Sequence, residues 1–172
     1  MMAQWTIDNS HSEVFFKVKH MVISTVTGEF TSFKSSIVSE TDDFTNAKFE
    51  FSADIDSINT KITDRDNHLK SADFFDAEQY PTLSFHSTSG LQNNSIKGNL
   101  TIKNVTKEII LDVDFGGVIN DPWNNQRAGF EMTGKISRKE FGLTWNQLTE
   151  AGGMVVGDTV RLIINAEYIS QK

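Results

Sequence analysis

The strongest constraint on the fold is the regular alternation of apolar and polar residues along most of the chain. In the segment 47–55, every odd-numbered residue from Ala47 to Ile55 is apolar and the residues between them are polar. This period of two is typical of a β-strand with one buried face. About eight such segments follow one another with turn residues between them, a spacing typical of an all-β sandwich or barrel. The alternation therefore predicts an all-β protein.

Closure into an antiparallel barrel would leave none of these strands with an unpaired edge. We therefore predict an eight-stranded lipocalin-like antiparallel β-barrel that forms one domain over residues 1–172. A barrel of this size either fills itself with side chains or holds one small ligand. We expect a ligand-holding barrel, because small residues that leave volume unfilled occur at inward-facing positions: Ala47, Ala53, Gly98, Ala128, Gly134 and Ala166.

Phenylalanine is unusually frequent, with 13 residues in a chain of 172. The rings could form a tightly packed core. They could equally line a cavity, since ligand pockets are mostly apolar and aromatic with few polar anchors. The sequence leaves both readings open.

Charge and composition exclude several classes of function. The chain carries 16 Lys and Arg residues against 23 Asp and Glu residues, a net charge of −7. This balance argues against a nucleic-acid partner and against adhesion to anionic membranes. No apolar run has the length needed to cross a bilayer, so we expect no stable membrane insertion. The absence of cysteine rules out disulfides and thiolate sites.

The N-terminal residues enter strand-like sequence directly, without a basic segment followed by an apolar one. As given, the chain is expected to be soluble and cytoplasmic. We find no nucleophile elbow, phosphate-binding glycine loop, dinucleotide fingerprint or zinc-protease motif. We therefore expect a binding protein rather than an enzyme, with no cofactor.

The strand pattern is interrupted once, between about residues 60 and 80. Thr63 and Asp66 have the spacing of a helix start, in which the hydroxyl group caps free N–H groups and the carboxylate faces the helix dipole. Three aromatic residues without strand alternation follow this helix: Phe74, Phe75 and Tyr80. We interpret the segment as a short helical lid that closes one end of the barrel.

The polar residues inside this pattern have more than one interpretation. Asp64 and His68 have the one-turn helical spacing of a metal-ligand pair, but a surface ion pair explains them equally, so no metal is predicted. His20 and His86 fall within apolar strand patterns, as hydrogen-bonded core residues or as polar anchors in a cavity. Arg65 could bind a lipid headgroup or a neighbouring aspartate. Arg138 is expected to pair with Glu140.

A series of motifs along the whole chain resembles the YceI-like family. The motifs are Asp8-Asn-Ser-His-Ser12, Gly28-x-Phe30, Arg65-Asp66-x-His68-Leu69, Asp73-Phe-Phe-Asp76, Tyr80-Pro81, Phe85, Gly98-x-Leu-Thr-Ile102, Val105-Thr-Lys107 and Arg138-x-x-Phe-Gly142. Two positions differ from the family pattern. Glu108 stands where proline is common, and Glu140 stands where aspartate is common.

The resemblance implies a lipocalin-like barrel that binds a long isoprenoid or similar amphiphilic lipid, such as a polyprenyl phosphate or an isoprenoid quinone, as a carrier, storage or sensing protein. A homodimer is possible. We expect Arg65, Asp66 and His68 to hold the lid and mouth, and Phe74, Phe75 and Tyr80 to close over the tunnel. The residues expected to contact the lipid chain are Phe16, His20, Phe49, Phe51, Phe85, Leu100, Phe130 and Met132.

Two alternatives remain. One is an enzyme acting on a lipid-like or quinone substrate, with His20 and His86 as acid–base groups. The other is a filled barrel with a stress-related structural role.

Overall fold

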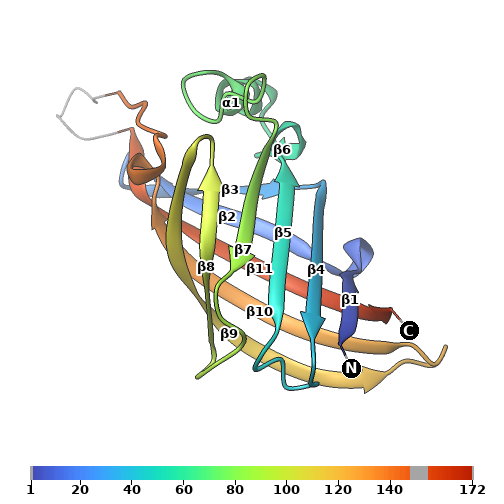
Figure 1. The fold of residues 1–172 in the computed structure, drawn as a ribbon. Helices are drawn as coiled ribbons and strands as arrows, with labels where there is room; N and C mark the ends of the chain where they lie inside the picture. Colours follow the sequence, from blue (N-terminus) through green and yellow to red (C-terminus); the bar gives the residue numbers. More distant parts are fainter. Residues whose placement is uncertain (1, 148–154, 172) are drawn as a thin grey trace.

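The computed structural model describes residues 2–147 and 155–171 and is dominated by antiparallel strands (Figure 1). One short α-helix, α1 (Thr63–Lys70), and three 3₁₀ turns, η1 (Asn9–His11), η2 (Ile55–Ser57) and η3 (Lys139–Phe141), interrupt them. The strands are β1 (Ala3–Ile7), β2 (Glu13–His20), β3 (Ser24–Phe30), β4 (Phe33–Ser39), β5 (Lys48–Asp54), β6 (Ile58–Asn59), β7 (Thr82–Ser87), β8 (Ser95–Ile102), β9 (Val105–Asn120), β10 (Gln126–Ser137) and β11 (Val156–Gln171).

Eight of these strands close into a ring in the order β1-β4-β5-β7-β8-β9-β10-β11, and β11 pairs back onto β1. Strands β2, β3 and β6 continue the sheet from β11 beyond this ring. The prediction of an eight-stranded antiparallel barrel with one short helix is confirmed. The sequence pattern did not distinguish β2, β3 and β6, which lie outside the ring, from the strands that form it.

Strand β11 is long enough to have two successive partners along one edge. Its C-terminal half pairs with β1, where Tyr168 lies opposite Ile7, and its N-terminal half pairs with β2, where Leu162 lies opposite Phe16. The turn η1 separates β1 from β2, and the Asp8 side chain begins this turn by accepting a hydrogen bond from the Ser10 backbone N–H (3.1 Å). The β2–β3 hairpin consequently extends the barrel wall at the end that carries α1 (Figure 1).

The other end of the barrel is filled by a cluster of rings that we call the aromatic plug: Trp5, Phe44, Phe49, Phe115, Phe130 and Tyr168. Phe130 lies at its centre, with its ring centroid 5.0 Å from that of Phe115 and 5.1 Å from that of Phe44. Stacked and edge-to-face pairs at these distances add to the stability gained by burial. This half of the barrel is therefore a packed core.

The small inward-facing residues do not leave empty volume, contrary to our expectation. The Phe85 ring lies over Gly98, the Phe16 ring lies over Gly28, and Leu111 packs against Gly134. A Cβ atom on Gly98 would stand 2.3 Å from Phe85 Cζ. The glycines accommodate neighbouring side chains, and the buried alanines pack within the hydrophobic core.

The segment between β6 and β7 contains the predicted helix but begins it differently. Ile62 is the N-cap residue and provides no side-chain hydrogen bond, so Thr63 does not cap the helix. Asp66 instead accepts a hydrogen bond from the Thr60 backbone N–H (2.8 Å). Within the described part of the chain, no helix has the length and apolar character required to span a membrane.

Candidate functional site

A narrow cavity of about 160 Å³ lies between the aromatic plug and the α1 segment. Phe49 and Tyr168 border it on the plug side, and Leu69, Phe74 and Phe75 border it on the α1 side. Between these limits the wall is formed by Val14, Phe15, Phe16, Val18, Phe30, Ser35, Phe51, Leu83, Phe85, Ile96, Leu100, Ile102, Ile109, Leu111, Met132, Ile136, Arg138, Leu143, Val156, Val160, Leu162 and Ile164.

Most of the residues expected to contact a lipid chain or to close over it lie on this wall. They are Phe16, Phe49, Phe51, Phe74, Phe75, Phe85, Leu100 and Met132. The two readings of the phenylalanine content both apply, because other rings pack in the core away from the cavity: Phe33, Phe44, Phe115, Phe130 and Phe141. The contacts with a ligand themselves stay a prediction.

Three of the expected residues lie elsewhere. His20 is exposed at the end of β2, where it lies opposite Ser24 on β3 and Val156 on β11, and it does not line the cavity. Phe130 is buried within the aromatic plug, and Tyr80 does not reach the cavity wall. His86 is also exposed and lies 3.7 Å from Glu50 on the outer surface. His20 and His86 are therefore not placed to act on a ligand in the cavity.

Arg65 and Asp66 fasten α1 to the chain just after β6. The Arg65 guanidinium donates to Thr60 Oγ1 from Nε (2.8 Å) and to the Thr60 carbonyl from Nη2 (2.6 Å). Asp66 binds the backbone N–H and the hydroxyl group of the same threonine. Arg65 thus uses Thr60 as its partner, in place of a neighbouring aspartate, and both side chains hold the helix in position.

His68 links the helix to the rest of the barrel end that carries α1, which we call the lid end. Its Nε2 lies 2.9 Å from Asp73 Oδ2, in place of the expected partner Asp64. Its ring packs edge-on against Trp145 (centroids 4.6 Å apart) and Phe74 (5.1 Å). Trp145, which the sequence analysis did not identify, therefore connects the segment after η3 to α1 over the end of the cavity.

Arg138 is a second residue that the sequence analysis misjudged. It is 3% exposed and lines the cavity, and its guanidinium donates to four backbone carbonyls in place of Glu140. These are the carbonyls of Leu143 (2.6 Å), Trp145 (2.9 Å), Val156 (3.1 Å) and Gly157 (2.7 Å). Burial lowers the pKa of Arg138, because it penalises the charged form. The side chain ties the segment after η3 to the start of β11.

At the other end of the cavity, the polar atoms of Ser35 and Tyr168 bond to each other. Ser35 Oγ donates its proton to the Glu50 carbonyl (2.7 Å), so it accepts from the Tyr168 hydroxyl group (2.8 Å). Burial raises the pKa of Tyr168 to about 12, and the Ser35 hydrogen bond offsets this only in part. The polar side chains of the wall thus have protein partners, and the cavity presents an apolar surface.

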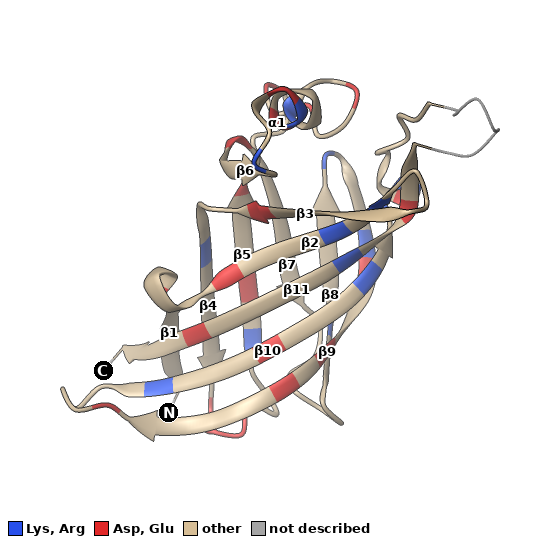
Figure 2. Cartoon of the chain, turned by 180° about the vertical axis from the view of Figure 1, so that it is seen from behind, with Lys and Arg blue, Asp and Glu red and all other residues tan. Residues whose placement is uncertain are grey.

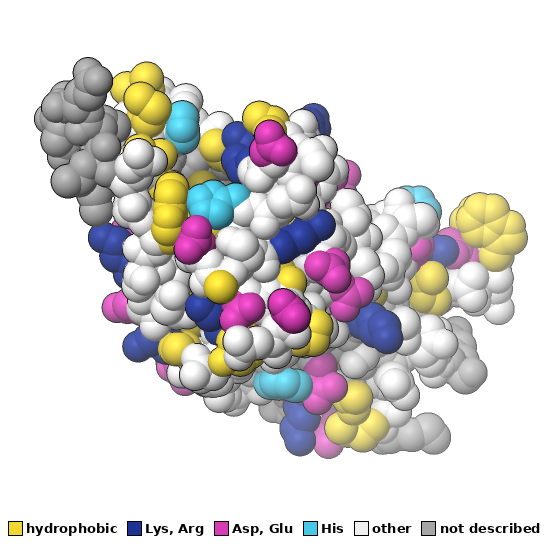
Figure 3. Space-filling model, turned by 90° about the horizontal axis from the view of Figure 1, so that it is seen from above, with side chains coloured by type: hydrophobic (Ala, Val, Ile, Leu, Met, Phe, Trp, Pro, Cys, Tyr) yellow, Lys and Arg dark blue, Asp and Glu magenta, His cyan; other side chains and the backbone are white. Residues whose placement is uncertain are grey.

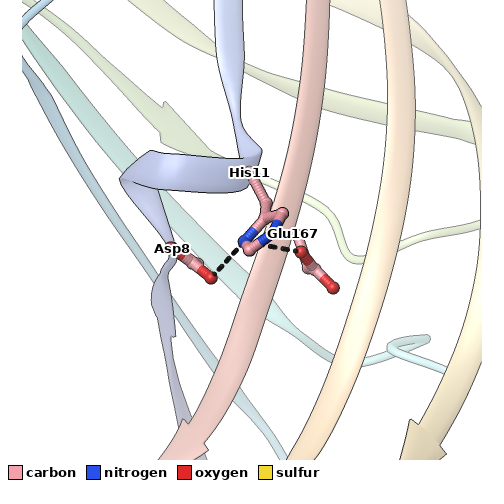
Figure 4. A group of neighbouring side chains, drawn as sticks. All are labelled: Asp8, His11 and Glu167. Carbon is pink, nitrogen blue, oxygen red and sulfur yellow. Dashed lines mark hydrogen bonds and ion pairs between the residues drawn. The ribbon is translucent and has the colours of Figure 1, made fainter. Parts of the chain in front are cut away.

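A separate charged cluster lies on the outside of the barrel beside η1 (Figure 4). His11 Nδ1 is 2.8 Å from Asp8 Oδ2 and 3.6 Å from Glu167 Oε2. Arg127 Nη1 reaches the same carboxylates, at 2.9 Å and 3.7 Å, and its Nε bonds to Asp121 (2.7 Å). Hydrogen bonds from Ser10 and His11 keep the pKa of Asp8 well below its ordinary value. Because Arg127 already neutralises these carboxylates, we interpret the cluster as an ion-pair network.

Comparison with known proteins places this barrel in a family. The model of the YceI-like domain matches residues 5–168. The UPF0312 protein SAB2563 of Staphylococcus aureus (strain bovine RF122 / ET3-1) is 38% identical over 168 residues, which cover 97% of this chain and 98% of the relative.

Solved structures with the same fold include three from different bacteria. Burkholderia cenocepacia BcnA superimposes with a TM-score of 0.80 at 19% identity, covering 94% of this chain and 98% of that one. The Campylobacter jejuni YceI protein gives 0.74 at 31% identity, covering 90% of each chain. A polyisoprenoid binding domain from Saccharophagus degradans gives 0.74 at 16% identity, covering 97% and 98%. The sequence matches over nearly the whole length show that this chain belongs to the YceI-like family.

Proposed function

We propose that this protein binds the hydrocarbon chain of an isoprenoid or a similar amphiphilic lipid inside the barrel, as a carrier, storage or sensing protein. The observation that carries this proposal is the apolar wall, on which the polar side chains Ser35, Tyr168 and Arg138 already bond to protein atoms. A polar ligand would lose its hydrogen bonds to water in such a cavity without replacement. A hydrocarbon loses none.

The energetics favour a branched hydrocarbon. An isoprene unit has five carbons, so its removal from water is favourable by about 4 kcal/mol at about 0.8 kcal/mol per carbon group. A few units would supply tight binding even after the entropy cost of association. A headgroup would then need only weak contacts to set the orientation of the ligand.

The size of the cavity adds a condition. Its volume of about 160 Å³ is close to the ~150 Å³ of an engineered apolar cavity that holds one benzene ring. The cavity as it stands therefore accommodates about one isoprene unit. A longer chain requires the wall to widen, and Phe15, Phe16, Phe51 and Phe75 are the rings on it that are only partly buried. We propose that these rings and the α1 segment move when a long ligand enters.

The relatives support the same class of ligand. The Saccharophagus degradans domain, which shares the fold, is described as a polyisoprenoid binding domain. An enzymatic alternative has less support, because His20 and His86, its proposed acid–base groups, lie outside the cavity.

Native mass spectrometry of the purified protein, followed by organic extraction, tests the proposal. We expect an adduct that extracts as a polyprenyl or quinone compound, or uptake of added polyprenyl phosphate by protein that carries none. A protein that neither carries nor takes up such a lipid would refute the proposal and favour a structural role for the barrel.

A pair of variants on one strand connects uptake to the cavity. Ile164 points inward between Val14 and Met132, so Ile164→Trp should fill the cavity and reduce uptake. Ile163 is the next residue on β11 and does not line the cavity, so Ile163→Trp should preserve uptake. Circular dichroism would verify that both variants fold. Equal uptake by the two variants would place the ligand elsewhere.

A further inference from the structure

The turn between β2 and β3 presents three consecutive apolar side chains to solvent. We call Met21, Val22 and Ile23, which are 42%, 73% and 84% exposed, the hairpin tip. The Met21 N–H donates to the Val155 carbonyl (2.8 Å), and the adjoining Val156 lines the cavity. The hairpin tip therefore lies beside the lid end of the cavity. Figure 3 looks down on this end and shows hydrophobic side chains on its surface.

The backbone of the hairpin tip does not suit the residues that occupy it. Met21 and Val22 have φ angles of +53° and +68°, and the Ile23 N–H bonds to the His20 carbonyl (3.2 Å). Tight hairpin turns with two positive φ angles strongly prefer Asn-Gly or Asp-Gly. A β-branched residue such as Val22 is an outlier there. Apolar side chains at this turn therefore disfavour the turn itself, without contributing to the core.

A row of cations crosses the outside of the barrel four residues along β2 from the hairpin tip. Lys17 on β2 lies opposite Arg161 on β11, which lies opposite Lys135 on β10. We call these three residues the basic row. Like charges directly opposite one another destabilise a sheet. Among the described residues, no carboxylate lies within 4 Å of these three cations.

Several acidic residues of the same sheet lie further from the lid end, although Glu29 on β3 and Asp112 on β9 are diagonal neighbours of Lys17 and Lys135. Glu13 on β2 and Glu131 on β10 flank Asn165, and Asp114 on β9 lies opposite Glu131. Glu13 is four residues from Lys17, which corresponds to about 13 Å along the strand. Figure 2 shows blue apart from red along β2, whereas β10 carries blue on both sides of its red segment. The basic row is thus a local positive surface on a chain whose net charge is −7.

Two further acidic residues lie near the basic row: Asp158 at the start of β11 and Glu140 on η3. Asp158 is engaged locally, since it accepts hydrogen bonds from Ser137 Oγ (2.6 Å) and from the Lys139 backbone N–H (3.1 Å). Glu140 is exposed on η3, next to the exposed Lys139. These groups balance Lys139 and Arg138 and leave the basic row without partners.

We propose that the hairpin tip and the basic row dock the lid end of the barrel on an anionic lipid bilayer. Exposed aliphatic side chains flanked by lysine and arginine bind such surfaces by burying apolar area and by attracting anionic headgroups. The hairpin tip projects from the barrel as a convex apolar feature, which suits a deformable bilayer. The anionic headgroups would repel Glu13, Glu131 and Asp114 on the far part of the sheet, and this repulsion would orient the barrel.

This inference rests on the proposed function in one respect, because a bilayer is where an isoprenoid ligand resides. It departs from the expectation, drawn from net charge alone, that the chain avoids anionic membranes. Docking in this orientation would bring the lid end of the cavity to the headgroup region, so that a lipid tail could pass into the barrel without crossing bulk water.

Vesicle flotation of the full chain tests the docking surface. The probes are vesicles of phosphatidylcholine alone and vesicles of phosphatidylcholine mixed with phosphatidylglycerol, at low and high salt. We expect binding to the mixed vesicles at low salt and weaker binding at high salt, because exposed charges are screened. Arg161→Gln should lower the partition coefficient about fivefold, which corresponds to about 1 kcal/mol per basic residue near the surface.

The hairpin tip is tested by replacing Met21 with Asn and Val22 with Gly together. This double variant has the residues that the turn prefers, so it should fold at least as well as the parent and still lose binding. Trp123→Ser is the matched control. Trp123 is 77% exposed, but it lies beside Asp121 in the β9–β10 turn at the other end of the barrel. This control should bind as the parent does.

Several outcomes would overturn the proposal. They are no binding to either vesicle at low salt, equal binding to both vesicles, or an equal loss in Trp123→Ser. If soluble polyglutamate bound the basic row while vesicles did not, the surface would serve an acidic protein and the proposal would fail. The Ile164→Trp variant separates the two hypotheses, because it should lose lipid uptake and still float with the mixed vesicles.

Discussion

Replacing Gly98 with alanine tests how the barrel positions the cavity wall. The ideal Cβ position at Gly98 is 2.3 Å from Phe85 Cζ and 2.7 Å from the His86 carbonyl oxygen. An ordinary contact begins at 3.4 Å, so the ring must withdraw by about 1.1 Å (3.4 − 2.3). The His86 carbonyl belongs to strand β7 and cannot move as easily as a side chain. The substitution therefore overpacks the wall.

Two opposing effects set the magnitude. Overpacking a well-filled core costs about 1–3 kcal/mol. Replacing glycine by alanine in a strand recovers about 0.5–1 kcal/mol, because glycine loses more conformational freedom on folding. We expect a net loss of about 1–2 kcal/mol in the free energy of unfolding, which urea denaturation would measure. The melting temperature should fall by about 2–8 °C for a chain of this size.

A double-mutant cycle identifies the contact responsible. Phe85→Leu removes the ring atoms nearest Gly98, so Gly98→Ala should cost less in that background. The coupling should exceed about 0.5 kcal/mol, the limit below which distant sites are additive. The rescue should be partial, since the His86 carbonyl stays in place. Additive costs, or an unchanged stability of Gly98→Ala, would show that Phe85 does not rest on Gly98.

Three further predictions follow from single contacts. Arg138→Lys should lower the free energy of unfolding in urea by about 2–3 kcal/mol, because one ammonium group cannot reach the four buried carbonyls that the guanidinium satisfies; an unchanged unfolding midpoint would contradict this role. Tyr168→Phe should cost about 1 kcal/mol at neutral pH. The raised pKa of Tyr168 means that its contribution is present below pH 10 and lost as the pH rises toward about 12, so wild-type stability should fall in that interval more steeply than that of Tyr168→Phe. Met21→Asn with Val22→Gly should raise the melting temperature by relieving about 1 kcal/mol or more of backbone strain, and scanning calorimetry would show no gain if the positive φ angles were unstrained.

The strand content of the fold could be predicted because it depends on a local pattern. Alternation such as that in 47–55 reports which face of a strand is buried, and the interruption at residues 60–80 reports where strands stop. The partners of β11 could not be predicted. Its pairing with both β1 and β2 depends on long-range register, which has no local signal. The division into a closed ring and a hairpin extension was therefore missed.

The cavity could be predicted in part, although one supporting reason was wrong. Small residues such as Gly98 and Gly134 were taken to leave space for a ligand, but large neighbouring side chains use that space. His20 continues the apolar alternation of β2, yet it stands at the last position of the strand, where its side chain is exposed. An alternation pattern gives the face of a residue and not its height along the barrel.

The lid end contains the residues that sequence reasoning found hardest. Arg138 bonds only to backbone carbonyls, and side-chain spacing carries no information about such partners. Trp145 lies in a segment, residues 143–158, that contains none of the motifs used in the sequence analysis. Within that segment, Val156 already belongs to β11, and residues 148–154 lie outside the described residues.

Several features that disfavour folding lie at the same end of the barrel. The aromatic plug has fewer of them: its rings pack on one another, although Trp5 Nε1 is buried without a hydrogen-bond partner among the described residues and Phe44 has a φ angle of +59°. At the lid end, Val22 adopts a positive φ angle, like charges face each other across β2, β11 and β10, and Arg138 is buried without a carboxylate partner. Natural sequences break local rules mainly where function requires it. The plug therefore supplies the stability that permits an unfavourable lid end, and the lid end is where a ligand would be exchanged.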